Sequence, residues 1–139
     1  MFGKILHAND GSEFAFHALE LAISIARQNN SELHMVSVEE IDYVPELIGE
    51  VRQETAAAAR RFHDVVQRAR KMAEEAEVRL QTHIIAGHPV RSIVNLAAEL
   101  EAELLIIGAR GHSALYERLV GSRADRIMQL AHCPVLVVK

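Results

Sequence analysis

Short apolar runs alternate with amphipathic stretches along the chain, and this alternation restricts the possible folds more than any other feature. Between the runs, apolar residues recur at helical spacing. Strands that are apolar throughout are typical of a parallel sheet covered on both faces. The pattern predicts an α/β fold, a doubly wound five-stranded parallel sheet with helices on both faces and right-handed crossovers. The predicted strands are KILHA (4–8), LHMVSV (33–38), RLQTHIIA (79–86), ELLIIG (103–108) and PVLVVK (134–139).

The segments between the strands predict four helices. The first starts after the turn residues Asp10-Gly11-Ser12, and the second is rich in Ala, Arg and Glu with opposite charges four residues apart. Residues 39–46 predict a loop, and GHP (87–89) predicts the break before the third helix. His7 and His34 stand within apolar strands and are expected in the core or at a sheet edge. The predicted helices span residues 12–29, 50–77, 92–100 and 122–131.

Size and composition limit the class of protein. The 139 residues, half of them hydrophobic, predict one domain over 1–139 with its own core. The net charge of −4 argues against nucleic-acid binding, and the one basic stretch, 60–71, is interleaved with acids as on a solvated helix face. A single cysteine, Cys133, excludes an internal disulfide. No apolar run approaches the ~18 residues of a membrane span, and no signal peptide is evident, so we expect a cytoplasmic protein.

Three loops are candidate binding segments, because ligands of such sheets bind beyond the carboxyl ends of the strands. They are residues 8–12, the residues after Val38, and residues 108–122. The last contains Gly108, Gly111, Gly121 and Ser122 at fixed spacing. Glycines allow close backbone approach, and a helix that starts at Ser122 offers free N–H groups to an anion. The same residues also fit an ordinary strand exit followed by an N-cap serine.

The spacing Gly108-x2-Gly111-x9-Gly121-Ser122 resembles the ATP-binding signature of the universal stress protein family. HCPVLVV at the end of the chain, Asp10-Gly11-Ser12 after the first strand and AGHP before the third helix are similar to that family too. The resemblance covers nearly the whole chain. It implies strand order 3-2-1-4-5, as in adenine nucleotide alpha hydrolase-like folds, and binding of ATP or another adenine nucleotide.

The resemblance also implies roles for individual residues. Asp10 and Val38 would meet the adenine and ribose, while Gly108, Arg110 and Gly111 would lie along the ribose and phosphates. Gly121, Ser122 and Arg123 would close on the phosphates.

Some of these residues also fit a purely structural role, and some positions depart from the family pattern. Asp10 also fits a helix cap or turn residue. His112 either faces the triphosphate or is merely solvated. Ala8-Asn9 replaces the family's usual residues before the aspartate and would alter the adenine contact, and Arg110 replaces a more usual histidine or serine and could pair with phosphate.

Binding is favoured over catalysis. The chain lacks GxxxxGK[ST], a GxGxxG after the first strand and the SGGxDS loop of ATP pyrophosphatases, and no nucleophile–base pair stands out. No protein-held metal site is expected, so Mg²⁺ or Mn²⁺ would come with the phosphates. The resulting hypothesis is an ATP-binding stress sensor or switch. A slow ATPase and a nucleotide-independent dimerisation module are the alternatives, and the resemblance implies a homodimer through the edge strand Pro134 to Lys139.

Overall fold

The five strands form a single parallel sheet in the computed structural model, which describes residues 1–41, 56–110 and 120–139. Their order across the sheet is β3-β2-β1-β4-β5, and every neighbouring pair is parallel. The predicted fold and strand order are therefore confirmed. The strands are β1 (Lys4–Ala8), β2 (Glu32–Glu40), β3 (Leu80–Gly87), β4 (Leu104–Gly108) and β5 (Val135–Val138).

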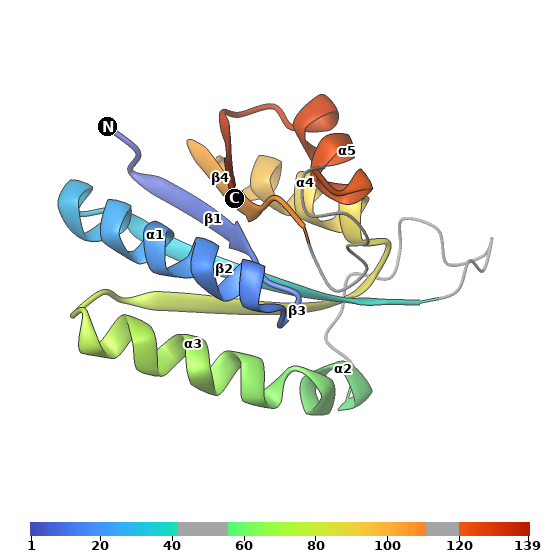
Figure 1. The fold of residues 1–139 in the computed structure, drawn as a ribbon, viewed down its shortest axis with the longest axis horizontal. Coiled ribbons are helices and arrows are strands. Elements are labelled where there is room, and N and C mark those ends of the chain that lie inside the picture. Colours follow the sequence, from blue (N-terminus) through green and yellow to red (C-terminus); the bar gives the residue numbers. More distant parts are fainter. Residues whose placement is uncertain (42–55, 111–119) are drawn as a thin grey trace.

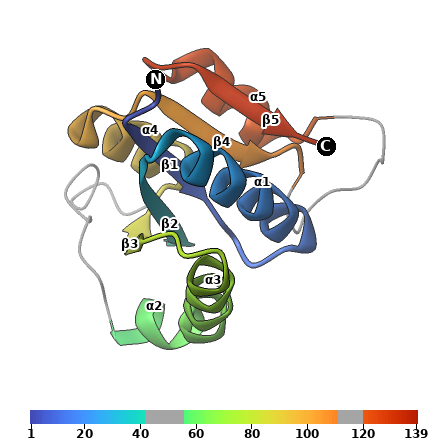
Figure 2. The same cartoon turned by 90° about the vertical axis from the view of Figure 1, so that its left-hand side faces the viewer.

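Helices cover both faces of this sheet (Figures 1 and 2). Each face buries its own apolar cluster. Leu19 and Ala69 pack on one face and Ile93 and Ile127 on the other. Because both faces are covered, the central strands β1 and β4 are buried over most of their length instead of alternating. One face carries α1 (Glu13–Asn29), α2 (Ala56–Arg61) and α3 (His63–Glu75), and the other carries α4 (Pro89–Leu100) and α5 (Ser122–Leu130).

The carboxyl ends of the strands share one edge of the sheet, toward which the arrowheads of β1 and β2 point in Figure 1. β1 is the central strand, with β2 on one side and β4 on the other. The order of the strands therefore reverses beside β1, which is the switch point where ligands of open α/β sheets bind. The ladders continue to this edge, because the amide of Asn9 donates to the carbonyl of Val36 at 2.9 Å and that of Ala109 to Val138 at 2.8 Å.

The prediction of one helix over residues 50–77 is wrong. Within the described residues, α2 ends at Arg61 and α3 begins at His63. Phe62 between them has a ψ of 9° and is only 3% exposed. The backbone leaves helical geometry where the aromatic side chain of this stretch is buried, and the uniform Ala, Arg and Glu composition does not reveal that point. Residues 50–55 of the prediction lie outside the described residues.

Two further boundaries differ from the prediction. β2 continues through Glu39 and Glu40, where a loop is predicted, because both residues still pair with the end of β3. α4 begins at Pro89 and not at Ser92. His88 is its N-cap, with its imidazole accepting a hydrogen bond from the first turn at 3.5 Å, and proline suits the first helical position. Residues 42–46 of the predicted loop lie outside the described residues.

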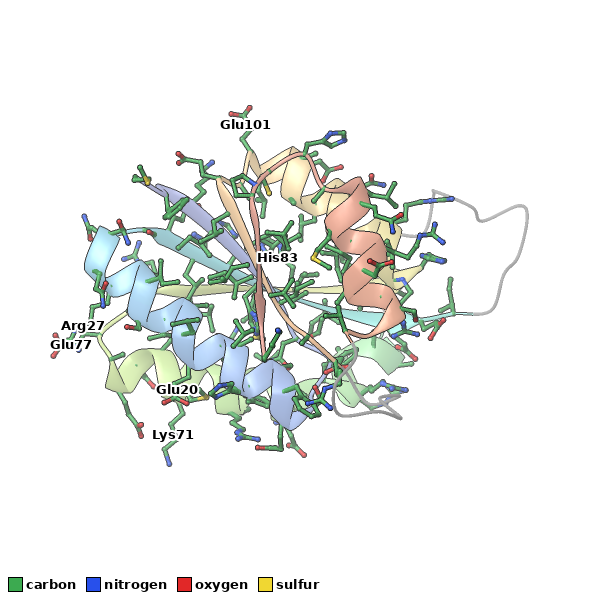
Figure 3. All side chains as sticks on the ribbon, turned by 45° about the horizontal axis from the view of Figure 1, so that its top comes forward. Glu20, Arg27, Lys71, Glu77, His83 and Glu101 are labelled. Atoms are coloured by element: carbon green, nitrogen blue, oxygen red, sulfur yellow. The ribbon has the colours of Figure 1, made fainter. Side chains whose placement is uncertain are left out.

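The strand histidines are buried as predicted. His7 is 0% and His34 is 3% exposed. The Nδ1 atom of His34 lies 2.8 Å from Nε2 of His83 on β3, and its Nε2 lies 2.6 Å from Oε1 of Glu32. Figure 3 labels His83 over the middle of the sheet. This polar chain therefore belongs to the sheet and not to the carboxyl edge. No helix in the described parts of the chain could cross a membrane.

Candidate functional site

The exit of β1 forms a tight polar turn that leads into α1. The amide of Gly11 donates to Oδ1 of Asn9 at 2.8 Å, and that of Ser12 donates to Oδ1 of Asp10 at 2.9 Å. Gly11 has a φ of 88°, which glycine adopts without strain. The Ser12 hydroxyl accepts the N–H of Ala15 at 3.2 Å and is the N-cap of α1. Asp10 is therefore a turn residue, half-buried at the carboxyl edge.

Asn9 is built into this edge, with an exposed fraction of only 2%. Its carbonyl accepts the hydroxyl of Ser37 at 2.8 Å, which ties the exit of β1 to β2. Its Oδ1 atom holds the turn, while Nδ2 has no hydrogen-bond partner among the described residues. Ala8, just before it, is half-buried. Asn9 thus supplies a side-chain acceptor for the Gly11 amide in this turn. The Ala8-Asn9 pair is where the chain departs from the family pattern.

The exit of β4 and the start of α5 are held together by a hydrogen bond from the amide of Gly121 to the carbonyl of Ala109, at 2.7 Å. The two motif glycines next to this bond have different surroundings. A Cβ atom at Gly108 would lie 3.1 Å from the backbone oxygen of Phe14 in α1. A Cβ at Gly121 would lie 3.4 Å from the Ala109 oxygen, an ordinary contact, and Gly121 has an unstrained φ of −61°. Close packing favours glycine at 108, whereas no contact with the described residues requires it at 121.

The N-terminus of α5 lies beside this exit and has no side-chain cap, because its N-cap residue is Gly121. The first N–H groups of a helix have no acceptor within the helix and carry the positive end of its dipole. Ser122 and Arg123 are exposed in this first turn, so a hydroxyl and a guanidinium accompany the amides. An anion, and a phosphate above all, suits such an arrangement.

Two arginines from the predicted site contact groups that sequence reasoning did not identify. The guanidinium carbon of Arg110 lies 4.3 Å from the centroid of the Phe14 ring, in a cation–π contact. Nη2 of Arg123 donates to Oε2 of Glu40. Glu40 ends β2 and Arg123 lies in the first turn of α5, so this ion pair crosses the carboxyl end of β1. The acidic residues after Val38 are visible in the sequence, but their partner from α5 is not.

The described part of the predicted site thus lies at one edge of the sheet. Gly111 and His112 lie outside the described residues. The contact of each residue with a nucleotide stays a prediction. The described members come from the exit of β1, the end of β2, the exit of β4 and the first turn of α5, and they are Ala8, Asn9, Asp10, Val38, Gly108, Arg110, Gly121, Ser122 and Arg123.

His7 lies in β1 just before this edge and is fully buried. Its Nδ1 atom lies 3.0 Å from the carbonyl oxygen of Ile106, which can only accept, so Nδ1 carries the proton. Nε2 has no hydrogen-bond partner among the described residues. Burial lowers the pKa of His7 to about 4, although the Ile106 carbonyl and the charge of Asp10 act in the opposite direction. The imidazole is therefore neutral near pH 7 and adds no positive charge to the site.

The described residues contain no group of three or more His, Cys, Asp or Glu side chains that could hold a metal ion. Cys133 is half-buried, and burial raises the pKa of its thiol. The thiol is therefore a poor nucleophile and a poor metal ligand near pH 7.

Comparison with protein families and curated proteins gives one consistent result. The family model described as universal stress protein family matches residues 1–139. The chain is 34% identical to universal stress protein MJ0531 of Methanocaldococcus jannaschii, covering 100% of this chain and 83% of that protein. It is also 34% identical to universal stress protein YxiE of Bacillus subtilis, with complete coverage of both chains.

Solved structures agree in fold. Universal stress protein UspA from Lactobacillus plantarum has a TM-score of 0.81 at 26% identity, covering 99% of this chain and 98% of that one. A universal stress protein in complex with cAMP has a TM-score of 0.77 at 23% identity, with 99% and 97% covered. The universal stress protein from Archaeoglobus fulgidus in complex with dAMP has a TM-score of 0.72 at 18% identity, with 100% and 98% covered. The last two are similar in fold, and each was solved with an adenine nucleotide.

Proposed function

This chain belongs to the universal stress protein family, and we propose that it binds an adenine nucleotide, ATP in the first place, and acts as a sensor or switch in a stress response. Two structural neighbours that carry cAMP and dAMP support the class of ligand. The carboxyl edge around β1 supports the location, because ligands of open α/β sheets bind at the switch point.

One observation carries the proposal, namely the glycine at position 121. Its φ would accept a side chain, and the nearest described atom to an added Cβ is the Ala109 oxygen at 3.4 Å, an ordinary contact, so the described part of the fold gives no reason for glycine. A phosphate that approaches the amides of α5 closely does give one, because a Cβ there would stand beside those amides. The uncapped first turn of α5 and the exposed Ser122 hydroxyl favour the same ligand.

In the proposed complex, the phosphates lie at the N-terminus of α5 and the nucleoside lies toward the end of β2. Ser122 and Arg123 donate to the phosphates, and Arg110 lies beside them on Phe14. Asp10 and Val38 meet the ribose and adenine. A divalent cation accompanies the phosphates, because the described residues offer no site of their own for it. Gly111 and His112 complete the proposed set.

Nucleotide binding acts as a switch only if two states of the protein differ in affinity for the nucleotide. The segments that meet at the edge come from the exits of β1, β2 and β4, so a ligand there contacts elements on both faces of the sheet. Binding would therefore bias the relative arrangement of these exits, and a partner that recognises one arrangement would read the occupancy.

Calorimetric titration tests the binding proposal. Wild type should bind ATP with magnesium and should bind GTP more weakly. Gly121→Ala should lower the affinity for ATP about 5- to 100-fold, the range of a misplaced methyl group, without loss of thermal stability. Gly3→Ala is the control at the opposite edge, where the added Cβ would displace the flexible end of Glu103, which accepts a hydrogen bond from the Gly3 amide, and would not touch the proposed site. Equal affinities of wild type and Gly121→Ala would contradict the proposed phosphate position.

We also propose that the chain forms a homodimer through β5. β5 is an edge strand whose residues Val135, Leu136 and Val137 are only half-buried, and exposed apolar edges favour pairing. The carbonyls of Pro134 and Val138 accept from β4, so the alternate residue Val137 directs its N–H to the open side.

Proline substitutions along β5 test the homodimer. Val137→Pro should shift the protein from dimer to monomer in sedimentation experiments and leave ATP binding intact. Leu136→Pro is the matched variant whose lost N–H faces β4, and it should destabilise the fold itself. A Val137→Pro protein that remains dimeric would exclude this interface.

A further inference from the structure

The ion pair between Glu40 and Arg123 joins two segments that would otherwise stand apart at the mouth of the proposed site. Glu40 is the last residue of β2, and Arg123 lies in the first turn of α5 after β4. β1 lies between β2 and β4, so the two segments are about two strand spacings, roughly 10 Å, apart. The two long side chains span this distance above the exit of β1, where Asp10 begins the turn.

The guanidinium of Arg123 is thus already occupied by a carboxylate. It stands in the same first turn whose amides suit an anion, and both side chains of the pair are about half exposed, at 52% for Arg123 and 60% for Glu40. An exposed ion pair is weak and exchanges readily. A phosphate offers more oxygen acceptors and more charge than a carboxylate and can pair with arginine in a bidentate way, whereas Arg123 donates from Nη2 to one oxygen of Glu40. Arg123 can therefore exchange Glu40 for phosphate.

Taken together, the described charges at the edge do not favour a polyanion. The segments 8–12, 36–40, 108–110 and 120–123 contain three carboxylates, Asp10, Glu39 and Glu40, and two guanidiniums, Arg110 and Arg123. Arg110 is stacked on Phe14, and Arg123 is paired with Glu40. A nucleoside, which has no phosphate, meets no penalty from Glu40, whereas a nucleotide has to compete with Glu40 for Arg123.

We propose that Glu40 is an internal competitor for the nucleotide phosphates, and that phosphate binding transfers Arg123 from Glu40 to the ligand. This inference rests on the proposed function. It makes Glu40 a specificity residue of that site, because the carboxylate lowers the affinity for every ligand that reaches Arg123 and leaves the affinity for adenosine unchanged. Release of Glu40 from Arg123 also gives the end of β2 two states that depend on nucleotide occupancy.

Titration of ATP and of adenosine into four proteins tests the exchange: wild type, Glu40→Gln, Arg123→Gln and the double variant. Glu40→Gln should bind ATP about two- to fivefold more tightly than wild type, the scale of an exposed ion pair, and should bind adenosine equally. Arg123→Gln should bind ATP about tenfold more weakly, the scale of a hydrogen bond to a charged group. In the Arg123→Gln background, Glu40→Gln should bring no gain.

The matched control is Glu20→Gln, which removes one negative charge from the outer side of α1, where Figure 3 shows Glu20 pointing away from the sheet. A gain in ATP affinity equal to that of Glu40→Gln would mean a general charge effect and overturn the inference. The inference would also be overturned if Glu40→Gln raised the ATP affinity in the Arg123→Gln background, or if Glu40→Gln alone left the ATP affinity unchanged. A lower ATP affinity of Glu40→Gln would overturn it too, and would assign Glu40 to the bound cation. ATP binding by neither wild type nor Glu40→Gln would overturn the proposed function itself, and the inference with it.

Discussion

Replacing His7 by asparagine should remove much of the pH dependence of the stability of this protein. His7 is fully buried in the central strand, with Nδ1–H donating to the Ile106 carbonyl and Nε2 without a described partner. Protonation would place a charge and an unpaired N–H in the core. Asparagine keeps an N–H near the position of Nδ1 but cannot take up a proton, so the substitution separates the titration from the hydrogen bond.

The size of the effect follows from the pKa of His7, which burial lowers from 6.5 to about 4. Well above pH 6.5 the imidazole is neutral in both the folded and the unfolded chain, so His7 does not lower the free energy of unfolding there. As the pH falls below 6.5, the unfolded chain takes up the proton while the folded protein does not, so the free energy of unfolding decreases. The loss is about 2 kcal/mol at pH 5 and approaches about 3 kcal/mol below pH 4.

Urea denaturation between pH 5 and 7.5 measures this effect. From pH 7.5 to pH 5, the free energy of unfolding of wild type should fall by about 2 kcal/mol more than that of His7→Asn. This difference does not depend on how stable the two proteins are at pH 7.5. Ile5→Val is the control, because it removes a buried methylene from the same strand without a titratable group and should cost about 1 kcal/mol equally at every pH. Identical pH slopes for wild type and His7→Asn would refute the reasoning.

Three further outcomes follow from particular contacts. Gly108→Ala should cost about 1–3 kcal/mol of unfolding free energy, because its Cβ would crowd the Phe14 backbone; a urea midpoint equal to that of wild type would disprove the crowding. Ser12→Ala should cost about 1 kcal/mol through loss of the α1 cap, measured in the same way, whereas Ser12→Gly should cost only a few tenths. The pKa of His83 should lie below 6.5, because burial and neighbouring His34 disfavour its charge; an NMR titration midpoint at or above 6.5 would speak against this.

Periodicity and composition were sufficient to predict the five parallel strands of this protein but not all their boundaries, and the strand order came from the family resemblance. The central strands β1 and β4 are buried over most of their length, so their apolar character is a direct consequence of their position. The break at Phe62 depends on where one aromatic side chain is buried, and Ala-rich neighbours conceal it. The extension of β2 through Glu40 depends on pairing with β3, which is a contact between distant segments. Local patterns do not contain that information.

The same distinction applies to the candidate site. Asp10, Val38 and Gly121 follow from strand exits and motif spacing, both of which are local. The ion pair of Glu40 with Arg123 joins residues 83 positions apart in the chain, and the stacking of Arg110 on Phe14 joins the exit of β4 to α1. Because of these contacts, both arginines already have a partner within the protein, Phe14 for Arg110 and Glu40 for Arg123. The contacts depend on the order of the strands, so they could be recognised only after the fold was known.

The motif glycines then differ in the evidence that each provides. Gly108 is favoured by the close approach of α1 to the end of β4, so a glycine there is expected whether or not a ligand binds. Gly121 has no such reason among its described neighbours, since its backbone and these neighbours accept a Cβ. A relative with glycine only at the first position therefore keeps the fold and gives no evidence for the ligand. Variants at position 121 therefore test the proposed nucleotide binding separately from stability, because affinity can fall there while the described fold remains unchanged.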